Sequence, residues 1–455
     1  MRTTRYYDII PWTTIVFESF FRRVWRWHFW TGLLACPVLL VVALTGAMYT
    51  FRDDIEDWQQ AEVRFVEPRG ERQSVSEQLV AVKAAYPTWT PTRVVLSGDA
   101  KRTTLVQVER PDAPPGAIWA VSVNPYSAEV IGEGEGRSPF FAGVLKLHRT
   151  LFAGTTGRIA VELTTSWTLV LLVSGFFLWW PKAWNRIRGV WLPRLTAKPY
   201  TVWRDLHSLA GIYLLPVLAL IAFTGLFFTV VWLPLFNGAT NGAGTFPNRL
   251  RNTASSGKAE SGKAPVAIDE AIDTARRSFP DHSLTLQLPK KSADTYAFTA
   301  RNGRGPSVSG VIAIDRYSGA VSSETHAEDL PITELARAYV LPIHMGTIAG
   351  TPTKIVAIIA CLASAGLGVS GIAMWLVRRP AGRFGFPRAS AAQVPKAAVI
   401  LILLLGAVLP TVGASLVLVV LGEWLFLRLS RPKTDPFPAE AAVGLSPVSV
   451  PQEVS

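Results

Sequence analysis

Four histidines lie next to long hydrophobic segments, and they occur as two repeated pairs. His28 lies in WHFWTGLLACPVLLVVALTGAMYTF, and His207 lies in LHSLAGIYLLPVLALIAFTGLFFTV, 179 positions later. His148 begins HRTLFAGTTGRI, and His344 begins HMGTIAGTPTKI, 196 positions later. An imidazole at a membrane boundary costs more free energy than an apolar side chain, and it is a common metal ligand. The duplication therefore predicts that all four histidines are ligands.

Other residues repeat at the same two offsets without a gap. They are Gly32 with Gly211, Pro37 with Pro216, Thr45-Gly46 with Thr224-Gly225, Gly154 with Gly350, and Ser174-Gly175 with Ser370-Gly371. Gly32 and Gly211 follow His28 and His207 by four residues, so each lies on the same helix face as its histidine. A glycine at that position leaves room for a porphyrin against the helix backbone.

The composition is that of a polytopic membrane protein. The chain has 455 residues, of which 49% are hydrophobic and 16 are tryptophan. Four apolar runs are long enough to span a bilayer, namely Phe29–Phe51, Ile159–Trp180, Leu206–Leu233 and Ile355–Val377. The stretch Ala397–Leu427 is predicted to form a hairpin of two short helices that turns at Pro410–Gly413, which gives six crossings. A single tilted helix is the alternative for this stretch.

The net charge of +12 is concentrated in four stretches that flank the apolar runs. Residues 1–27, 181–206, 378–396 and 428–433 hold 19 Lys and Arg residues against three acidic residues. This is the positive-inside pattern, so these stretches are predicted to be cytoplasmic and no nucleic-acid partner is expected. The first apolar run lacks a cleavage site and is predicted to be a signal anchor. Cys36 and Cys361 lie within apolar runs and are predicted to be free thiols.

Two long insertions follow the first and third apolar runs, and they resemble each other. VSEQLVAVKAAYP from Val75 matches IDEAIDTARRSFP from Ile268, and both have helical period and end at a proline. VNPYSAEV from Val123 matches IDRYSGAV from Ile314, and each predicts a β-hairpin. Each insertion is therefore predicted to be one helix packed on a small antiparallel sheet. The stretch Asn237–Lys263 is predicted to be a mobile lead-in to the second insertion.

The fold predicted from these patterns is a polytopic α-helical membrane protein. It consists of two tandem repeats, each with two transmembrane helices and an inserted periplasmic α+β domain, followed by a C-terminal transmembrane hairpin. The predicted division is residues 1–51 for the cytoplasmic N-terminus and first transmembrane helix, 52–147 for the first periplasmic domain, 148–180 for a histidine loop and second helix, 181–205 for a cytoplasmic loop, 206–233 for the third helix, 234–343 for the second periplasmic domain, 344–377 for a histidine loop and fourth helix, 378–396 for a cytoplasmic loop, 397–430 for the hairpin and 431–455 for a cytoplasmic tail.

The depth of each histidine decides the expected pairing. His28 and His207 lie on the cytoplasmic side, whereas His148 and His344 lie on the opposite side, about 30 Å away across one bilayer. Two imidazoles on opposite faces of a flat macrocycle hold a bis-histidine haem, so each level is predicted to bind one haem. Both are expected to be haem b, because the sequence has no C-x-x-C-H motif. A bare zinc or copper ion is the weaker interpretation, since two histidines are too few ligands.

Several charged residues are predicted to serve these sites. Arg26, Arg149, Arg158 and Lys354 lie near the histidine levels, where they are either solvated flanking charges or partners that neutralise haem propionates. Glu162, in the first turn of the second transmembrane helix, either favours that helix terminus or handles protons. The predicted cofactor-binding set is His28, His207, His148, His344, Gly32, Gly211, Arg26 and Arg149. No motif for a nucleotide, a hydrolase or a metalloprotease is visible in the sequence.

On these residues the chain resembles the PepSY-associated transmembrane family of iron-regulated bacterial inner-membrane proteins. The resemblance covers about residues 20–430 and rests on the two H-x-x-x-G segments, the two insertions, His148 and His344. It implies PepSY-like periplasmic domains and a dihaem reductase that reduces a ferric siderophore, or another ferric chelate, in the periplasm. The implied electron donor is a quinol or a cytoplasmic reductase, and membrane lipid is the other expected partner. The alternative is a non-enzymatic PepSY scaffold that binds a peptide or inhibits a peptidase.

Overall fold

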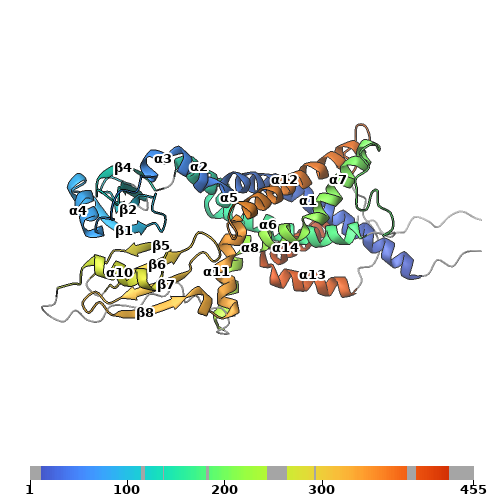
Figure 1. Cartoon of the computed structure of the whole chain (residues 1–455). Helices are drawn as coiled ribbons and strands as arrows, with labels where there is room; N and C mark the ends of the chain where they lie inside the picture. Colours follow the sequence, from blue (N-terminus) through green and yellow to red (C-terminus); the bar gives the residue numbers. More distant parts are fainter. Residues whose placement is uncertain are drawn as a thin grey trace, which may run out of the picture.

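A computed structural model describes residues 12–113, 118–136, 138–180, 184–242, 264–291, 294–386 and 396–429. A bundle of apolar helices occupies one end of the molecule, and an antiparallel sheet with its own helices occupies the other (Figure 1). The end of the bundle nearest the sheet is called here the sheet side, and the opposite end the far side. The predicted terminal segments 1–11 and 430–455, and residues 243–263 of the predicted lead-in, lie outside the described residues.

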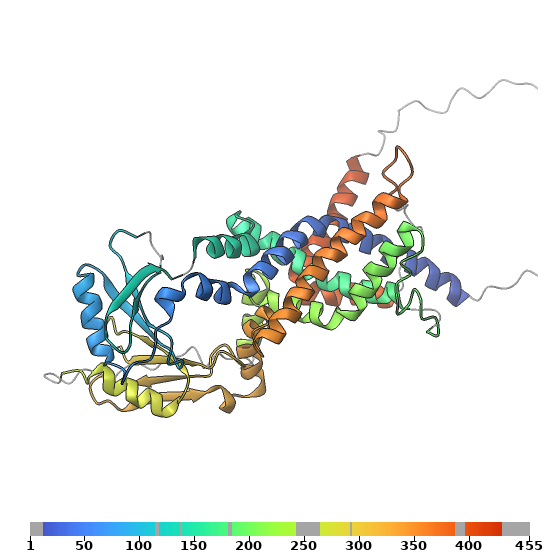
Figure 2. The ribbon, with the colours of Figure 1, turned by 45° about the horizontal axis from the view of Figure 1, so that its top comes forward.

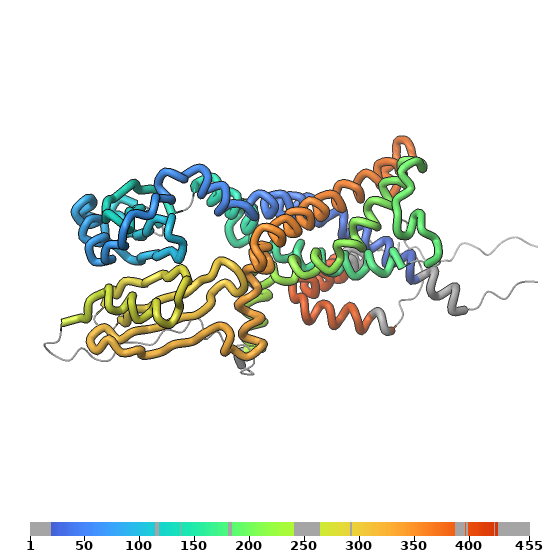
Figure 3. The backbone as a smooth tube through the Cα atoms, in the orientation of Figure 1, coloured from blue at the N-terminus to red at the C-terminus, as the bar shows by residue number. Residues whose placement is uncertain are grey.

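The bundle is built on long apolar helices that run between the two sides. They are α1 (Trp12–Thr50), α6 (Gly154–Trp179), the pair α7 (Pro199–Tyr213) and α8 (Leu215–Leu226), and α12 (Thr351–Arg378). Among the described residues, three helices are long and apolar enough to cross a membrane, and the bent pair makes a fourth if it counts as one span. α12 packs along α1 for much of its length, so the first helix of one repeat contacts the last helix of the other (Figure 3).

The third predicted span differs from the expectation of a single helix over Leu206–Leu233. α7 and α8 meet at Leu214 with a bend of 66°. Pro216 lies in the first turn of α8, where its missing N–H needs no acceptor. The matching Pro37 lies inside the continuous helix α1, so proline alone does not decide where the chain bends.

Residues 396–429 form a helical hairpin of α13 (Lys396–Val408) and α14 (Pro410–Leu429). Its turn lies at Leu409, and Pro410–Gly413, where the turn was predicted, are the first residues of α14. A side chain on Gly413 would lie 2.6 Å from the Gly406 carbonyl oxygen, so glycine is needed for the two helices to approach this closely. Each apolar stretch, Val399–Val408 and Pro410–Gly422, is shorter than a typical span, so the two crossings stay a prediction.

Each insertion contributes four strands and one helix, and the hairpins and helices lie where the repeats predict them. The first has β1 (Thr90–Leu96), β2 (Thr104–Glu109), β3 (Trp119–Val123), β4 (Val130–Glu135) and α4 (Val75–Ala85); the second has β5 (Ser283–Gln287), β6 (Tyr296–Arg301), β7 (Gly310–Ile314), β8 (Val321–His326) and α10 (Ile268–Ser278). The two expected small sheets are in fact one eight-stranded sheet of order β4-β3-β2-β1-β5-β6-β7-β8. α4 and α10 lie side by side and share its hydrophobic core (Figure 2).

Two contacts join the insertions at the centre of this sheet. β1 pairs with β5 in antiparallel register, with Arg93 opposite Gln287. The Asp269 carboxylate in α10 accepts hydrogen bonds from the backbone N–H of Val75, at 2.6 Å, and from the N–H and hydroxyl of Ser76. Asp269 therefore caps the helix of the other repeat, because the first N–H groups of α4 have no partner within their own helix.

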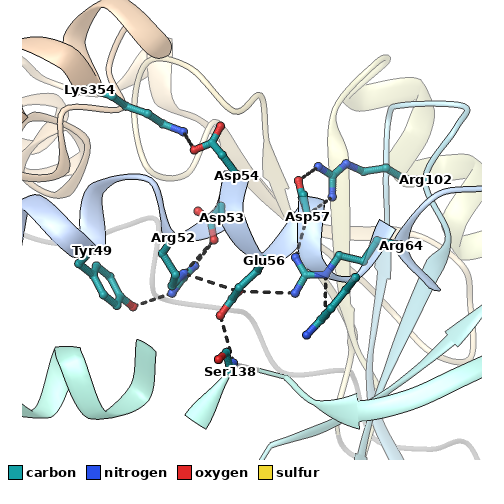
Figure 4. Close-up of polar contacts among 11 residues, drawn as sticks. Tyr49, Arg52, Asp53, Asp54, Glu56, Asp57, Arg64, Arg102, Ser138 and Lys354 are labelled. Carbon is teal, nitrogen blue, oxygen red and sulfur yellow. Dashed lines mark hydrogen bonds and ion pairs between the residues drawn. The ribbon is translucent and has the colours of Figure 1, made fainter. Parts of the chain in front are cut away.

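A charged cluster connects the sheet to the bundle (Figure 4). It centres on the buried Glu56 in α2 (Arg52–Gln59), just after α1. Glu56 accepts from the backbone N–H of Ser138 at 3.0 Å and lies 3.8 and 3.5 Å from Arg52 and Arg64. Ser138 immediately precedes α5 (Pro139–Thr150), so this carboxylate holds α5 against the end of α1.

The same cluster extends to the first insertion and to the second repeat. Arg64 and Arg102 both pair with Asp57, and Lys354 of α12 pairs with Asp54 (Figure 4). Burial opposes ionisation, but the hydrogen bonds from Arg102 and Arg64 hold the pKa of Asp57 below its ordinary value. Opposite charges therefore fix the junction where the chain passes between bundle and sheet.

Candidate cofactor site between the two repeats

The structure brings the four histidines together in the two pairs that the repeats suggest. On the far side, the ring centres of His28 in α1 and His207 in α7 are 6.3 Å apart, with ring planes at 85°. On the sheet side, His148 in α5 and His344 in α11 (Ile332–Met345) have ring centres 6.4 Å apart, with planes at 60°. In both pairs one imidazole comes from each repeat.

Each imidazole is held through its Nδ1 atom by a hydroxyl residue that directly precedes a glycine. The four contacts are His28 to Ser174 at 2.9 Å, His207 to Ser370 at 3.0 Å, His148 to Thr45 at 3.1 Å and His344 to Thr224 at 3.3 Å. Three of these Nδ1 atoms also lie within hydrogen-bond distance of a backbone carbonyl: Val42 for His148, Ile221 for His344 and Leu367 for His207. Every hydroxyl and carbonyl partner of a ring belongs to the same repeat as the histidine itself.

These contacts fix which ring nitrogen carries the proton. A carbonyl oxygen can only accept, so the Nδ1 atoms of His148, His207 and His344 carry hydrogen. For His28 the hydroxyl decides, because Ser174 Oγ donates its single hydrogen to the Leu171 carbonyl at 3.1 Å. That hydroxyl must therefore accept from His28 Nδ1–H. In the neutral form of all four rings Nε2 therefore keeps its lone pair, and this is the form of histidine that binds a metal.

The glycine after each hydroxyl residue lies against the imidazole. A side chain on Gly46, Gly175 or Gly225 would lie 3.3, 3.3 or 3.2 Å from Cε1 of His148, His28 or His344. At Gly371 the corresponding distance to His207 Cε1 is 3.8 Å, an ordinary contact. The Ser/Thr-Gly pairs are therefore the seats of the four rings, with one residue binding the nitrogen and the next leaving space for the ring.

Gly32 and Gly211, which the sequence analysis expected to adjoin a porphyrin, contact different groups. A side chain at these positions would meet Leu171 at 3.9 Å and Leu367 at 3.7 Å. Neither glycine lies against a histidine ring in the structure. Their role beside a macrocycle stays a prediction.

The two pairs lie closer together than the predicted bilayer thickness. On α6, Ser174 binds His28, while Thr165 lies beside Gly225, the glycine under His344. Nine residues of helix separate these positions, which is about 14 Å at 1.5 Å per residue. On α1, His28 and the His148 seat at Thr45 are 17 residues apart, or about 26 Å. One metal ion cannot be shared between the levels, so each pair is a separate candidate site.

Both pairs fit a metal-centred group bound between two imidazoles. Two nitrogens on opposite sides of one metal ion lie about 4 Å apart, which places the ring centres about 6 Å apart. The observed separations of 6.3 and 6.4 Å agree with this value. The described residues include no group of three or more His, Cys, Asp and Glu side chains able to hold a metal ion, so the remaining ligands have to come from the bound group itself. Haem supplies such ligands.

The four predicted propionate partners fall in different places. Arg26 is half-buried in α1, and Phe21, five residues before it, packs against Phe177 of α6. Arg149 is exposed and follows His148 directly in the sequence. Arg158 donates to the Phe228 carbonyl at 3.3 Å, and the Phe228 ring lies 5.3 Å from that of His344. Lys354 pairs with Asp54 and lies over the Phe51 ring, in the charged cluster described above. Propionate binding by these residues stays a prediction.

Glu162 stabilises a helix terminus, but not that of its own helix. Its fully buried carboxylate accepts from the backbone N–H groups of Val230, Val231 and Trp232 at 2.9 to 3.0 Å. These N–H groups lie at the start of α9 (Trp232–Gly242), the helix that follows α8. Glu162 thus fixes the exit of the chain toward the second insertion. Asn237–Gly242, expected in the lead-in, belong to this helix.

The sequence shows the Ser-Gly and Thr-Gly pairs as repeated residues but does not indicate their role. Their signal was the repetition itself, at the same two offsets as the histidines. A pattern cannot show which hydroxyl reaches which ring, since each hydrogen bond joins residues more than a hundred positions apart.

Comparison with known proteins gives one family. The model of the PepSY-associated TM region matches residues 25–378, which include all four histidines and both insertions. No curated protein matches the chain.

Proposed function

Because the chain belongs to the family defined by the PepSY-associated TM region, we propose that it is a dihaem electron-transfer protein of the bacterial inner membrane. In this proposal it reduces ferric iron held in a chelate, such as a ferric siderophore, in the periplasm. The electrons come from a quinol or from a reductase on the cytoplasmic side. Fe(II) binds hard oxygen chelators more weakly than Fe(III) does, so reduction releases the metal.

The observation that carries the proposal is the arrangement of the four imidazoles. Each has its Nδ1–H bound, so that the neutral ring offers Nε2 to a metal, and the ring centres of each pair are separated by the spacing of a bis-imidazole complex. A buried polar residue that served only to anchor a helix would not need this arrangement four times. A haem held by His28 and His207, and another held by His148 and His344, would supply one-electron transfer at the two levels.

The side chains around the rings have two tasks in this proposal. The seat hydroxyls and the carbonyls hold each ring in one tautomer and one orientation. The imidazoles therefore move little when the group bound between them gains or loses an electron. The apolar helices exclude water from the two sites. Gly46, Gly175 and Gly225 let the rings lie against the helix backbone, which keeps the sites within the bundle.

The orientation follows the charge bias of the sequence. The far side faces the cytoplasm and the sheet faces the periplasm, because the basic stretches flank the far side of the helices. A reporter fused after Lys433 tests the last hairpin and the orientation together. We expect no periplasmic alkaline phosphatase activity, and such activity would mean a single crossing in place of the hairpin.

The scaffold alternative rests on the sheet. β4 and β8 are its edge strands, and an extended peptide can add to an exposed edge through backbone hydrogen bonds. This alternative explains the insertions but gives no task to the histidine pairs. A preparation that binds no haem yet captures peptides would favour it.

The direct test of the proposed function uses the purified full chain, reduced with dithionite under anaerobic conditions. Addition of a ferric chelate should reoxidise the protein, seen as loss of the reduced α-band, and Fe(II) should be trapped by a ferrous-specific dye at one iron per electron. The double variant His148→Ala/His344→Ala should lose this reaction with the chelate. A wild-type protein that stays reduced in the presence of every ferric chelate tested would contradict the proposal.

A further inference from the structure

The sheet-side histidine pair is approached from the two repeats by loops of opposite character. In the loop between α5 and α6, Phe152 and Ala153 are exposed, and so is Gly154, the first residue of α6. The matching loop after His344 is buried or half-buried at every position from Gly346 to Gly350 except Ala349. The loop next to His148 is therefore exposed, whereas the loop next to His344 is partly covered by other parts of the protein.

The second insertion covers the loop of its own repeat. Gly305 donates a backbone hydrogen bond to the Ile348 carbonyl at 3.0 Å, and Ser307 donates to the Ala338 carbonyl in α11 at 2.9 Å. A side chain on Gly350 would meet Arg304 at 3.6 Å. The chain between β6 and β7 is thus laid over the His344 loop.

The residues at matching positions differ in chemistry as well. At the offset of 196, the first repeat has Lys146, Arg149 and Phe152 where the second has Pro342, Met345 and Ile348. Lys146 and Arg149 are exposed, and the Phe152 side chain is 58% exposed. The Lys146 ammonium lies 6.0 Å from the centre of the Phe152 ring. The last turns of α5 and the open loop therefore present positive charge next to an aromatic ring, whereas the matching residues of the second repeat present neither.

The open loop also holds its backbone in an unfavourable conformation. Leu151 and Phe152 have φ of 48° and 56°, in the left-handed region that non-glycine residues rarely adopt. In the second repeat the left-handed positions are Gly346 and Gly350, where glycine removes the cost. Two adjacent strained residues cost on the order of 1–3 kcal/mol each, and such strain concentrates at functional sites. Here it holds an aromatic ring at an exposed position next to Lys146.

We propose that the end of α5 with Lys146 and the α5–α6 loop with Phe152 form the docking surface for the ferric chelate, and that the chelate is anionic and has aromatic donor groups, as in a tris-catecholate complex. This rests on the proposed function, because it concerns the acceptor of the same site. The cations attract the negative charge of such a complex, and the Phe152 ring stacks on a catechol ring. Docking there brings the iron next to the His148 member of the sheet-side pair. The reaction is the gain of one electron by Fe(III), with no atom transferred, and the electron comes from the quinol or cytoplasmic reductase of the proposed function, which is oxidised.

The test measures binding separately from electron transfer. The probe is the trianionic gallium(III) tris-catecholate complex, in which the metal is not reduced, with a neutral gallium(III) trihydroxamate complex as the uncharged comparison. Equilibrium dialysis against the detergent-purified full chain gives the affinity for each. We expect the wild type to bind the anionic complex at least tenfold more tightly than the neutral one, and Lys146→Ser to remove most of that preference.

Phe152 is tested with variants that separate its ring from its backbone. Phe152→Asn keeps the left-handed conformation, which asparagine tolerates, but removes the ring, so we expect about tenfold weaker binding in a correctly folded protein. Phe152→Tyr should bind like the wild type. Ile348→Ala, at the matching covered position, is the control and should leave the affinity within about twofold.

Three results would overturn the proposal. The first is wild-type protein that does not bind the gallium complex. The second is Lys146→Ser and Phe152→Asn that bind it as the wild type does. The third is unchanged chelate affinity with loss of co-purified phospholipid in these variants, which would make the loop a lipid anchor. Gallium binding needs no haem, so a protein without haem would contradict the proposed function and leave this measurement valid. A protein whose haem is oxidised by ferric chelates, but whose loop variants bind gallium chelate normally, would keep the function and refute the docking site.

Discussion

The two histidine pairs are held by the same kind of contact, but the elements that supply it are exchanged between them. On the far side, the bundle helices α1 and α7 carry the histidines, and the seats are Ser174-Gly175 in α6 and Ser370-Gly371 in α12. On the sheet side, the short helices α5 and α11 carry the histidines, and the seats are the Thr-Gly pairs near the ends of α1 and α8. α1 thus carries a histidine of one pair and the seat for a histidine of the other pair.

This exchange separates two tasks. Every seat belongs to the same repeat as its histidine, so one repeat orients both of its imidazoles without help from the other. Every facing pair, in contrast, joins the two repeats. The orientation of each imidazole is therefore determined within its own repeat. The complete site forms only when the contact of α1 with α12 brings the two repeats together.

The largest effect is expected when a ligand is removed. His28→Ala should delete the far-side haem and leave the sheet-side haem, whereas His148→Ala should do the reverse, because the two levels are too far apart to share a group. The measurement is the haem content of each purified variant, which should fall to half that of the wild type. His207→Ala should reproduce the spectrum of His28→Ala, and His344→Ala that of His148→Ala.

If His28→Ala and His148→Ala instead removed the same haem, with His207 and His344 holding the other, the pairing across repeats would be wrong. A control for general damage is His282→Ala, which changes a histidine in the second insertion and should keep both haems.

The next effect distinguishes the two members of the far-side pair. His207 has the Leu367 carbonyl as a second partner at 3.1 Å, whereas His28 has only the Ser174 hydroxyl among the described contacts. Ser174→Ala should therefore free the His28 tautomer and weaken far-side haem binding about tenfold to a hundredfold, the usual effect of losing such a partner. Ser370→Ala is the matched control and should have a much smaller effect, because the carbonyl still holds His207 Nδ1–H.

Haem titration of the two variants measures this difference, and the far-side midpoint potential reports the orientation independently. Equal affinities and equal potentials for Ser174→Ala and Ser370→Ala would show that the carbonyl partner does not matter.

The helices, the insertions and the histidine pairing were accessible from sequence because each depends on local periodicity or on exact repetition. Three of the four predicted spans are long apolar helices, and the insertion helices end at Ala85 and Ser278, just before the expected prolines. The bend at Leu214 was not accessible, since Pro37 and Pro216 are equivalent in sequence and only Pro216 begins a new helix. Which proline bends the chain depends on the packing around it.

Long-range contacts were also beyond the sequence. The junction of β1 with β5 turns two small sheets into one, and no local pattern specifies that pairing. The same holds for Glu162, whose position in the first part of α6 suggested a role at its own helix terminus, although its carboxylate caps α9 instead. The seat residues were visible as repeats, but their partners are defined only by the tertiary fold.

The smallest effect concerns the glycines under the rings. Gly225→Ala would place a methyl group 3.2 Å from His344 Cε1, so the ring has to move by a few tenths of an ångström. We expect a cost of about 1–3 kcal/mol, seen as earlier loss of the sheet-side haem on heating. Gly371→Ala, with 3.8 Å to His207 Cε1, should keep its haem to the wild-type temperature or slightly above it. If the two variants lost their haem at the same temperature, the distance between the glycine and the imidazole would have no effect on the stability of the site.

The most direct test of the central claim, that the four histidines form two sites across the repeats, is the haem content of the full chain made with adequate haem supply. A pyridine haemochrome assay combined with a protein determination should give two haem b groups per chain, with the α-band of a bis-histidine complex in the reduced protein. A chain that contains no haem under these conditions would contradict the account.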